Sequence, residues 1–263
     1  MSLQKPALSF LARSGYAARG VVYLLVGGLA FLASINAGGK TTGGKGALQS
    51  LLDAPFGYVI LTCLALGLTA YATWRTVQAV VDTDNHGKGA KALAIRASLI
   101  VSAVLHSLLA ISVVRLLVSF GGSGGEGSKS LVSSLMETTA GRAVLVAVSA
   151  AIVVAGLAHA YKGWAASFDR HFSVPTHLQP LLYPFCRFGL VSRGLVLMVV
   201  GGLLLLAVYN MDASQVGGMD KAFSWLHAQV FGNIILAGVS LGLLAFASYS
   251  FIESRYRIIG LSR

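Results

Sequence analysis

The feature of this sequence that most restricts its fold is a series of six apolar runs, each long enough to cross a lipid bilayer. A membrane-spanning helix needs roughly 20 residues to cross about 30 Å of hydrocarbon. In lipid every backbone group must be hydrogen-bonded within its own segment, and barrel strands would be about ten residues long and alternating, so we expect helices. The runs cover residues 17–35, 57–80, 97–119, 141–165, 188–209 and 231–252. The sequence therefore predicts an all-α integral membrane protein with six transmembrane helices.

The composition and the placement of charge agree with this class. Hydrophobic residues make up 56% of the chain and charged residues 11%, whereas soluble domains carry about 25% charged residues. The formal net charge is +11, but most of the 20 lysines and arginines fall on the side of the membrane that holds the N-terminus. This positive-inside bias predicts that both termini lie in the cytoplasm and that nucleic acid is not a partner.

One string of residues occurs twice in the chain. RSGYAARGVVYLLVGGLA spans residues 13–30, and RFGLVSRGLVLMVVGGLL spans residues 187–204. The middle third aligns with both, so the chain divides into copies of one unit: a helix, a glycine-rich outer loop, a short amphipathic helix and a returning helix. The predicted repeats are residues 8–82, 92–168 and 185–257, with a cytoplasmic linker at 166–184.

Each repeat contains an even number of helices, so all three enter the membrane from the same side. Parallel repeats are related by an axis along the membrane normal, and the expected arrangement is three helical hairpins in a pseudo-threefold bundle. Small residues at equivalent positions of the returning helices predict close helix packing in every repeat. The aligned sets are Arg13, Arg96 and Arg187; Arg19, Ser102 and Arg193; Gly57, Gly141 and Gly232; and Gly67, Ala151 and Gly242.

The first repeat resembles a known family. The strings ARSGYAARGVVYLLVGGLA and GALQSLLDAPFGYVILTCLALGLTAYATWRTVQA are similar to the repeat of bacterial membrane proteins catalogued as domain of unknown function 1206. The resemblance covers residues 8–257 and implies three two-helix units in a bacterial inner (plasma) membrane. It implies no activity. The middle repeat departs most, because it has Ser102 in place of the second arginine and His106 in place of Tyr23.

The repeated arginines have two interpretations. Long cationic side chains anchor helices by reaching the headgroups at the inner surface. Alternatively, arginines from three repeats converge on an anion or a lipid phosphate, which the planar guanidinium binds in a bidentate manner. The candidate lipid- or anion-binding residues are Arg13, Arg19, Arg96, Arg187 and Arg193.

Three further polar residues fall within the apolar runs. Arg115 lies near the outer end of its run, where its side chain can reach the outer surface. His106 and His159 lie on the two helices of the middle hairpin, where histidines on facing helices can ligate a b-type haem or relay protons. A hydrogen-bonded structural role is the expectation for both, and we expect no cofactor and no metal.

The sequence offers no support for catalysis. It contains no HExxH or GxxxxGK[ST] motif, which zinc proteases and nucleotide-binding enzymes require. None of its nine acidic residues lies in the middle of a run, which disfavours a proton-coupled carboxylate transporter or an acidic cation channel. We therefore expect a non-enzymatic scaffold or accessory subunit, with membrane lipids and a membrane protein as the partners to test. The alternatives are a channel or carrier for anions or small neutral solutes along the pseudo-threefold axis, and a haem-bearing redox subunit.

Overall fold

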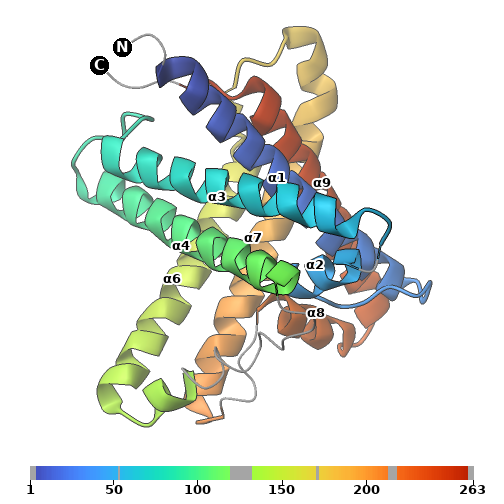
Figure 1. Cartoon of the computed structure of the whole chain (residues 1–263). Helices are drawn as coiled ribbons and strands as arrows, with labels where there is room; N and C mark the ends of the chain where they lie inside the picture. Colours follow the sequence, from blue (N-terminus) through green and yellow to red (C-terminus); the bar gives the residue numbers. More distant parts are fainter. Residues whose placement is uncertain (1–3, 53, 119–131, 170–171, 213–217, 260–263) are drawn as a thin grey trace.

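Long helices form almost the whole structure. The computed structural model describes residues 4–52, 54–118, 132–169, 172–212 and 218–259. In this part of the chain six helices are long and apolar enough to cross a membrane (Figure 1), and no strand occurs beyond an isolated bridge between Phe172 and Arg257. The six are α1 (Gln4–Ser34), α3 (Gly57–Val81), α4 (Ala90–Val118), α6 (Thr139–Trp164), α7 (Gln179–Tyr209) and α9 (Gly232–Tyr256). The predicted all-α membrane class is confirmed.

Two short helices lie at the end of the bundle opposite the termini, which we call the loop end. They are α2 (Gly44–Leu52) and α8 (Met219–His227), at the positions where the sequence predicts an amphipathic helix in repeats one and three. Residues 132–136, at the equivalent position of repeat two, are also helical. Phe223 and Leu226 of α8 are buried against the bundle, whereas Trp225 is 43% exposed. Apolar burial on one face therefore holds α8 in place.

The aligned glycines at the start of each returning helix have a steric reason. A Cβ atom on Gly57 would overlap the carbonyl oxygen of Leu51, and Gly141 and Gly232 approach the carbonyls of Leu135 and His227 in the same way. The turn that joins the short helix to the returning helix is therefore too tight for any side chain at these positions.

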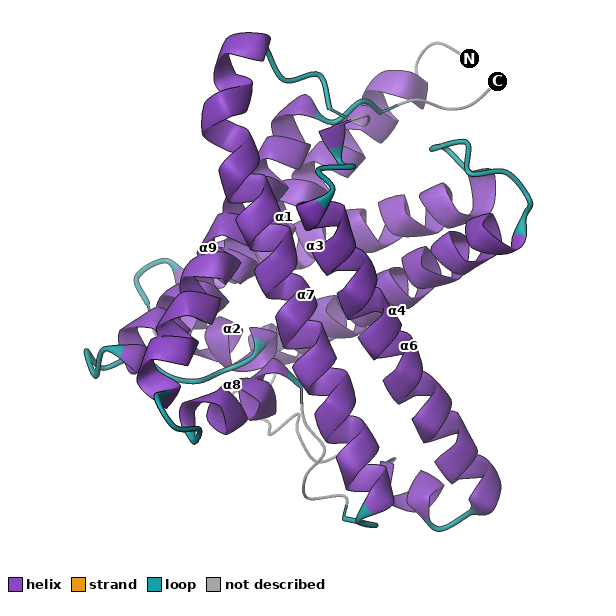
Figure 2. Ribbon diagram, turned by 180° about the vertical axis from the view of Figure 1, so that it is seen from behind, coloured by secondary structure: helices purple, strands orange, loops and turns teal. Residues whose placement is uncertain are grey.

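The helices pack in a ring that follows the order of the repeats. The second helix of each repeat packs extensively on the first helix of the next, in the pairs α3–α4, α6–α7 and α9–α1. Within repeats one and three, α1 packs on α3 and α7 on α9. In the described part of the chain α4 and α6 make no comparable contact, and the α6–α7 pair separates from the α3–α4 pair (Figures 1 and 2). The ring is thus closed on every side except between α4 and α6.

Glycines explain why the middle repeat differs. A Cβ on Gly15 would lie 2.6 Å from the Cα of Tyr71 on α3, and a Cβ on Gly189 would overlap the backbone at Phe246 on α9. The equivalent residue of the middle repeat is Ser98, which is exposed. A serine side chain excludes the close approach that the two glycines permit.

The prediction that a small-residue face packs in all three repeats is wrong for the middle one. Gly67 and Gly242 each meet the first helix of their own repeat, whereas Ala151 is exposed. Helix α6 instead presents Gly156 and Gly163 to α7. Contact between successive repeats takes the place of contact within the repeat.

The interior has two apolar regions. In the loop half of the bundle the core is built by residues from α1, α2, α3, α4, α7, α8 and α9, among them Val26, Leu61, Val113, Val196, Phe223 and Leu243. In the terminal half, where both chain ends lie, Tyr249 and Phe246 of α9 pack against Phe168, Phe172 and Val174. The last three belong to the segment between α6 and α7, which covers this end of the bundle.

The segment 166–184 is therefore only partly a linker. A 3-10 turn at Thr176–Leu178 leads directly into α7, which begins at Gln179. Pro180 is one reason, because a proline in the first turn of a helix needs no amide hydrogen and has a suitable φ. Pro180 and Pro184, which in the sequence indicate a loop, therefore lie in the first part of α7.

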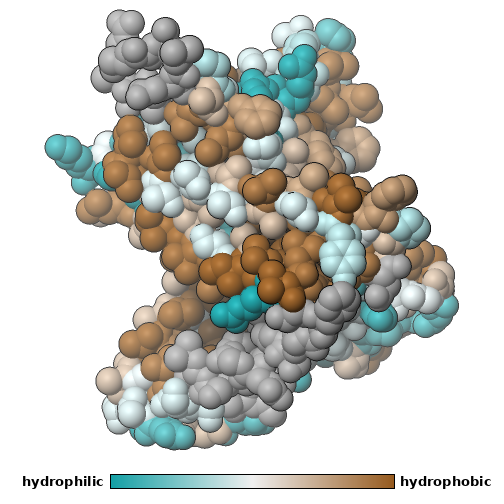
Figure 3. Space-filling model, viewed as in Figure 1, coloured by the Kyte–Doolittle hydropathy of each residue, from teal (hydrophilic) through white to brown (hydrophobic). Residues whose placement is uncertain are grey.

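Apolar side chains cover much of the outer surface. The viewed face in Figure 3 carries them across its middle, with hydrophilic side chains gathered toward its extremities. Leu66 of α3, Leu105 of α4 and Val154 of α6 are each more than half exposed. A surface of this kind is stable in lipid and not in water.

Candidate functional site

The three aligned arginines Arg13, Arg96 and Arg187 share one structural role. Each lies on the first helix of a repeat and donates hydrogen bonds to carbonyls at the C-terminal end of the preceding repeat's second helix. The bonds run from Arg13 to Ser254 (2.8 Å) and Arg255, from Arg96 to Ala79 (2.5 Å) and Val80 (3.1 Å), and from Arg187 to Trp164 (2.9 Å). The last carbonyls of a helix have no intrahelical partners, and this end of the helix carries a negative partial charge. A guanidinium donates hydrogen bonds to the carbonyls and interacts favourably with that charge. The structure thus gives these three arginines a capping function at the seams of the ring.

Arg19 lies in the interior of the bundle, with 2% of its surface exposed. Its guanidinium donates to the hydroxyls of Tyr71 at 2.7 Å and Ser250 at 3.1 Å, and it forms an ion pair with Glu253. Its carbon Cζ also lies 5.0 Å from the ring centroid of Phe246. Every side of this cation is therefore occupied by a partner from α3 or α9.

The ion pair of Arg19 belongs to a closed circuit of hydrogen bonds. Arg257 bridges Glu253 and Asp84 with bonds of 2.9 Å each. The circuit returns from Asp84 through Gln78 (3.0 Å) to Arg75 (3.1 Å), and from Arg75 to the Tyr71 hydroxyl (2.7 Å). It joins α1, α3, the chain after α3 and the end of α9, and so ties repeat one to repeat three.

Arg193 is aligned with Arg19 but has a different environment. Its Nε and Nη1 atoms are buried and have no hydrogen-bond partner among the described residues. Its Cζ atom lies 4.5 Å from the ring centroid of Phe246 and 5.0 Å from that of Tyr23. Cation–π contacts stabilise the charge but leave the N–H donors of Nε and Nη1 unused.

The two histidines come from the helices that do not pack on each other. The Nδ1 atom of His106 bonds to the Ser102 carbonyl at 2.7 Å, and that of His159 bonds to the Ala155 carbonyl at 2.8 Å. The ring of His106 also meets the Tyr71 ring at 4.5 Å between centroids. Among charged groups, Arg193 acts most strongly on both histidines, so both lie within electrostatic range of it.

We call the charged residues of the region around Arg193 the central cluster. It consists of the cations Arg19, Arg75, Lys162, Arg193 and Arg257 and the carboxylates Glu253 and Asp84. Within the described residues, no carboxylate lies within 4 Å of Arg193 or Lys162. Lys162 bonds instead to the Tyr249 hydroxyl at 3.2 Å. Cations outnumber carboxylates in the central cluster, and an unpaired buried charge is strongly unfavourable.

Of the residues singled out in the sequence, only some meet. His106 and His159 lie within electrostatic range of Arg19 and Arg193, whereas Arg13, Arg96 and Arg187 lie at the helix ends. Arg115 is exposed on the last turn of α4, at the loop end. The convergence of all five repeated arginines on a single vestibule is not observed.

Five members of the central cluster are not singled out by the sequence: Arg75, Asp84, Lys162, Glu253 and Arg257. Glu253 lies beyond the last apolar run, but α9 continues through it and it is 1% exposed. The signal was available in the repeats: counted from the aligned glycines, Gln78, Lys162 and Glu253 are equivalent positions. A polar residue at the same inward position in three apolar helices marks a polar interior.

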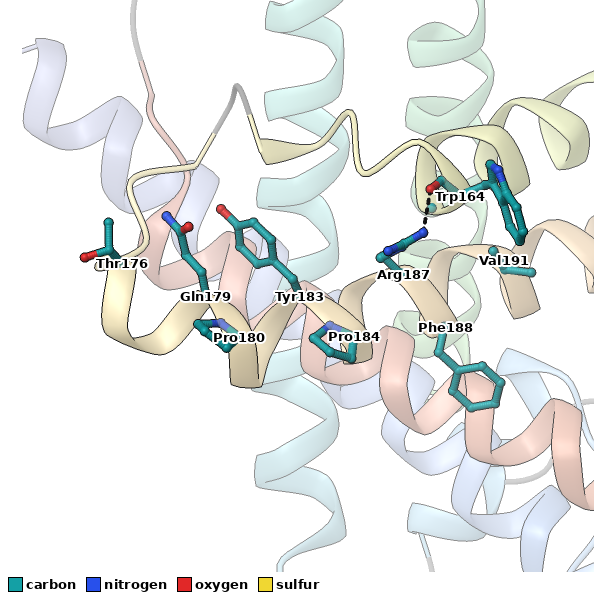
Figure 4. A pocket seen from close by; sticks show the side chains of 10 residues that line it. Trp164, Thr176, Gln179, Pro180, Tyr183, Pro184, Arg187, Phe188 and Val191 are labelled. Atoms are coloured by element: carbon teal, nitrogen blue, oxygen red, sulfur yellow. Dashed lines mark hydrogen bonds between the residues drawn. The ribbon is translucent and has the colours of Figure 1, made fainter.

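A groove of about 670 Å³ lies at the terminal end, between α6 and the start of α7 (Figure 4). Trp164, Gln179, Tyr183 and Phe188 line it, and Arg187 crosses it to reach the Trp164 carbonyl. Because the cation of Arg187 is bonded to that helix end, the groove presents mainly aromatic and amide surface. It is distinct from the central cluster.

Comparison with known proteins places this architecture in a family. A family model described as Domain of Unknown Function (DUF1206) matches three stretches, residues 14–82, 97–166 and 188–257. The chain is also 27% identical over 260 residues to a protein of Bacillus subtilis (strain 168) named "Uncharacterized protein YxxB". That alignment covers 96% of this chain and 92% of the relative. No solved structure matches.

Proposed function

We propose, since the chain belongs to the DUF1206 family and repeats its unit three times, that it is a non-enzymatic membrane protein that binds a phosphate-bearing anion at the central cluster. It acts in the bacterial inner membrane with both termini in the cytoplasm, as the distribution of Lys and Arg favours. The terminal end of the bundle then faces the cytoplasm.

The observation that carries this proposal is the state of Arg193. Arg193 is half-buried as a residue, but its Nε and Nη1 atoms are fully buried and require an acceptor, and no protein oxygen of the described residues supplies one. Phosphate oxygens match the fork of the guanidinium in geometry and charge. Lys162 and the remaining cations of the central cluster add attraction for the same anion.

The two alternatives have less support. A pore along the axis would have to pass the apolar core of the loop half, which Val26, Val196 and Leu243 help to fill. A b-type haem would need the rings of His106 and His159 as axial ligands, but the His106 ring packs against Tyr71 at 4.5 Å between centroids, as a structural histidine does.

The test is native mass spectrometry of the full chain purified from bacterial membranes in mild detergent. We expect a bound phosphate-bearing species on the wild type, and its retention falls about tenfold in Arg193→Ala because a charge-assisted contact is lost. Arg142→Ala is the matched control, since Arg142 is a half-buried arginine bonded to Thr139 at the loop end.

Equal retention in Arg193→Ala and the wild type overturns the proposal, provided that both variants unfold at the same temperature. An absorption spectrum of the same sample tests the haem alternative. A Soret band would identify haem, and not a phosphate-bearing anion, as the ligand bound in the interior of the bundle.

A further inference from the structure

We infer that the anion reaches Arg193 sideways from the membrane, as the headgroup of a lipid that enters between α4 and α6. This inference rests on the proposed function and adds the source of the phosphate and its route. Among the described residues, the route is the side of the helix ring at which neighbouring helices make no extensive contact. We call it the lateral opening.

Pseudo-threefold symmetry identifies the walls of the lateral opening. In repeat one, Gly15 and Ala18 of α1 meet Tyr71 and Gly67 of α3. The equivalent residues of repeat two have no such partners, so their side chains face the gap. They are Ser98, Val101, Leu105 and Leu108 on α4, and Val148, Ala151, Ile152 and Ala155 on α6.

These walls are apolar and exposed. Val101, Leu105 and Leu108 are 52%, 57% and 54% exposed, and Val148 is 44% exposed. Of the six long helices, α4 and α6 also bury the smallest share of their apolar windows, 28% and 17%. Hydrocarbon chains are a suitable filling for such a space, because apolar walls offer water no hydrogen bonds.

The inner limit of the lateral opening is cationic. His106 from α4 and His159 from α6 lie within electrostatic range of Arg193, and Arg193 lies six residues, or about 9 Å along the helix, from Arg187 at the terminal end. An apolar passage that ends at an unpaired guanidinium matches a molecule with a long apolar part and an anionic head. A phospholipid has this form.

Other routes for an anion are blocked by parts of the fold. At the terminal end, Phe168 and Phe172 of the segment after α6 pack on Tyr249 beneath the central cluster. At the loop end, the apolar core around Leu243 and Phe223 separates the cluster from solvent. A free phosphate ion would have to cross one of these layers, whereas a lipid needs only to move within the membrane.

The experiment uses the full chain in vesicles of phosphatidylcholine that contain a phosphatidylglycerol probe with a photoreactive diazirine on its acyl chain. We expect adducts on the α4 and α6 walls of the lateral opening. Unlabelled phosphatidylglycerol should compete for these adducts, and inorganic phosphate should not. Arg193→Ala should lose them but keep the labelling of lipid-facing positions such as Leu66 on α3.

A matched pair of variants tests the route separately from the site. Ala151→Trp fills the lateral opening, whereas Ala150→Trp places the same bulk 100° around α6. Both alanines are exposed, so either side chain fits the folded protein. We expect loss of wall adducts in Ala151→Trp alone.

The outcomes are distinct. Equal labelling in the two tryptophan variants, with phosphate binding still dependent on Arg193, overturns the lateral route and leaves the anion site. Competition by inorganic phosphate overturns the lipid as the source. Failure of any Arg193-dependent binding is the failure of the proposed function itself.

Discussion

Arg19 and Arg193 show how two equivalent residues acquire different energetics. Both are the second arginine of the same repeated string, but Arg19 faces Glu253 whereas Arg193 faces the rings of Tyr23 and Phe246. Removing one partner of a buried ion pair leaves an uncompensated charge, whereas removing an unpaired charge relieves one. Sequence equivalence therefore does not imply equal contributions to stability.

We expect Arg19→Met to lower the free energy of unfolding by about 3–5 kcal/mol, because Glu253 loses a buried partner. Arg193→Met should leave it unchanged or raise it. Thermal unfolding of both variants in detergent without added anionic lipid measures the difference. A large loss of stability in Arg193→Met would show that its donors are satisfied in the folded protein.

At the scale of elements, close helix packing depends on single glycines. The α1–α3 contact needs Gly15, where a Cβ would lie within 3 Å of three atoms of Tyr71. On the same helix, Gly28 has nothing within 4 Å of such a Cβ. The two positions look alike in the sequence and differ only in what the fold brings against them.

Gly15→Ala should therefore destabilise the protein by about 1–3 kcal/mol through overpacking. Gly28→Ala should be neutral or stabilise it by up to about 1 kcal/mol, since alanine favours the helix more than glycine does. Thermal unfolding of the two variants side by side is the measurement. Equal effects of both would contradict the α1–α3 contact.

The elements themselves could be predicted from the sequence, but their pairing could not. Apolar length predicts each of the six helices, and α1 and α7 exceed the prediction only because they continue beyond the apolar run at their N-terminal ends. The open α4–α6 side depends on Ser98 and Ala151. Both are small residues, but each is larger than the glycine at the equivalent position of the other two repeats. Hydropathy does not register a single methyl or hydroxyl group.

The candidate site follows the same division. The repeated arginines are visible in the sequence, yet their separation into end caps and interior charges depends on six residues of helix, which rotate and raise the second arginine relative to the first. The burial of Glu253 could not be predicted from the sequence. A carboxylate at a helix end is normally expected in solvent, and only the structure shows the chain that covers this one.

At the scale of the whole molecule, the capping arginines make each repeat depend on its neighbour. Arg96 of repeat two caps α3 of repeat one, Arg187 of repeat three caps α6 of repeat two, and Arg13 of repeat one caps α9 of repeat three. A change in one repeat is therefore expected to act on another.

Hydrogen exchange monitored by mass spectrometry tests this dependence. Arg96→Met should speed exchange in the last turn of α3, Arg187→Met in that of α6 and Arg13→Met in that of α9, because unpaired terminal carbonyls let the helix end fray. Arg115→Met, at an exposed arginine outside these seams, should change none of them. Faster exchange confined to the substituted repeat would contradict the cyclic arrangement.

The same cyclic capping has a consequence for how such a chain can be divided. A single repeat on its own would present one arginine with no helix end to bind and one helix end with no arginine. Three separate copies arranged around an axis would satisfy all of these groups at once. In physical terms the three repeats of this one chain are arranged as three subunits of a trimer would be. In the described residues the middle repeat makes no extensive contact between its own two long helices.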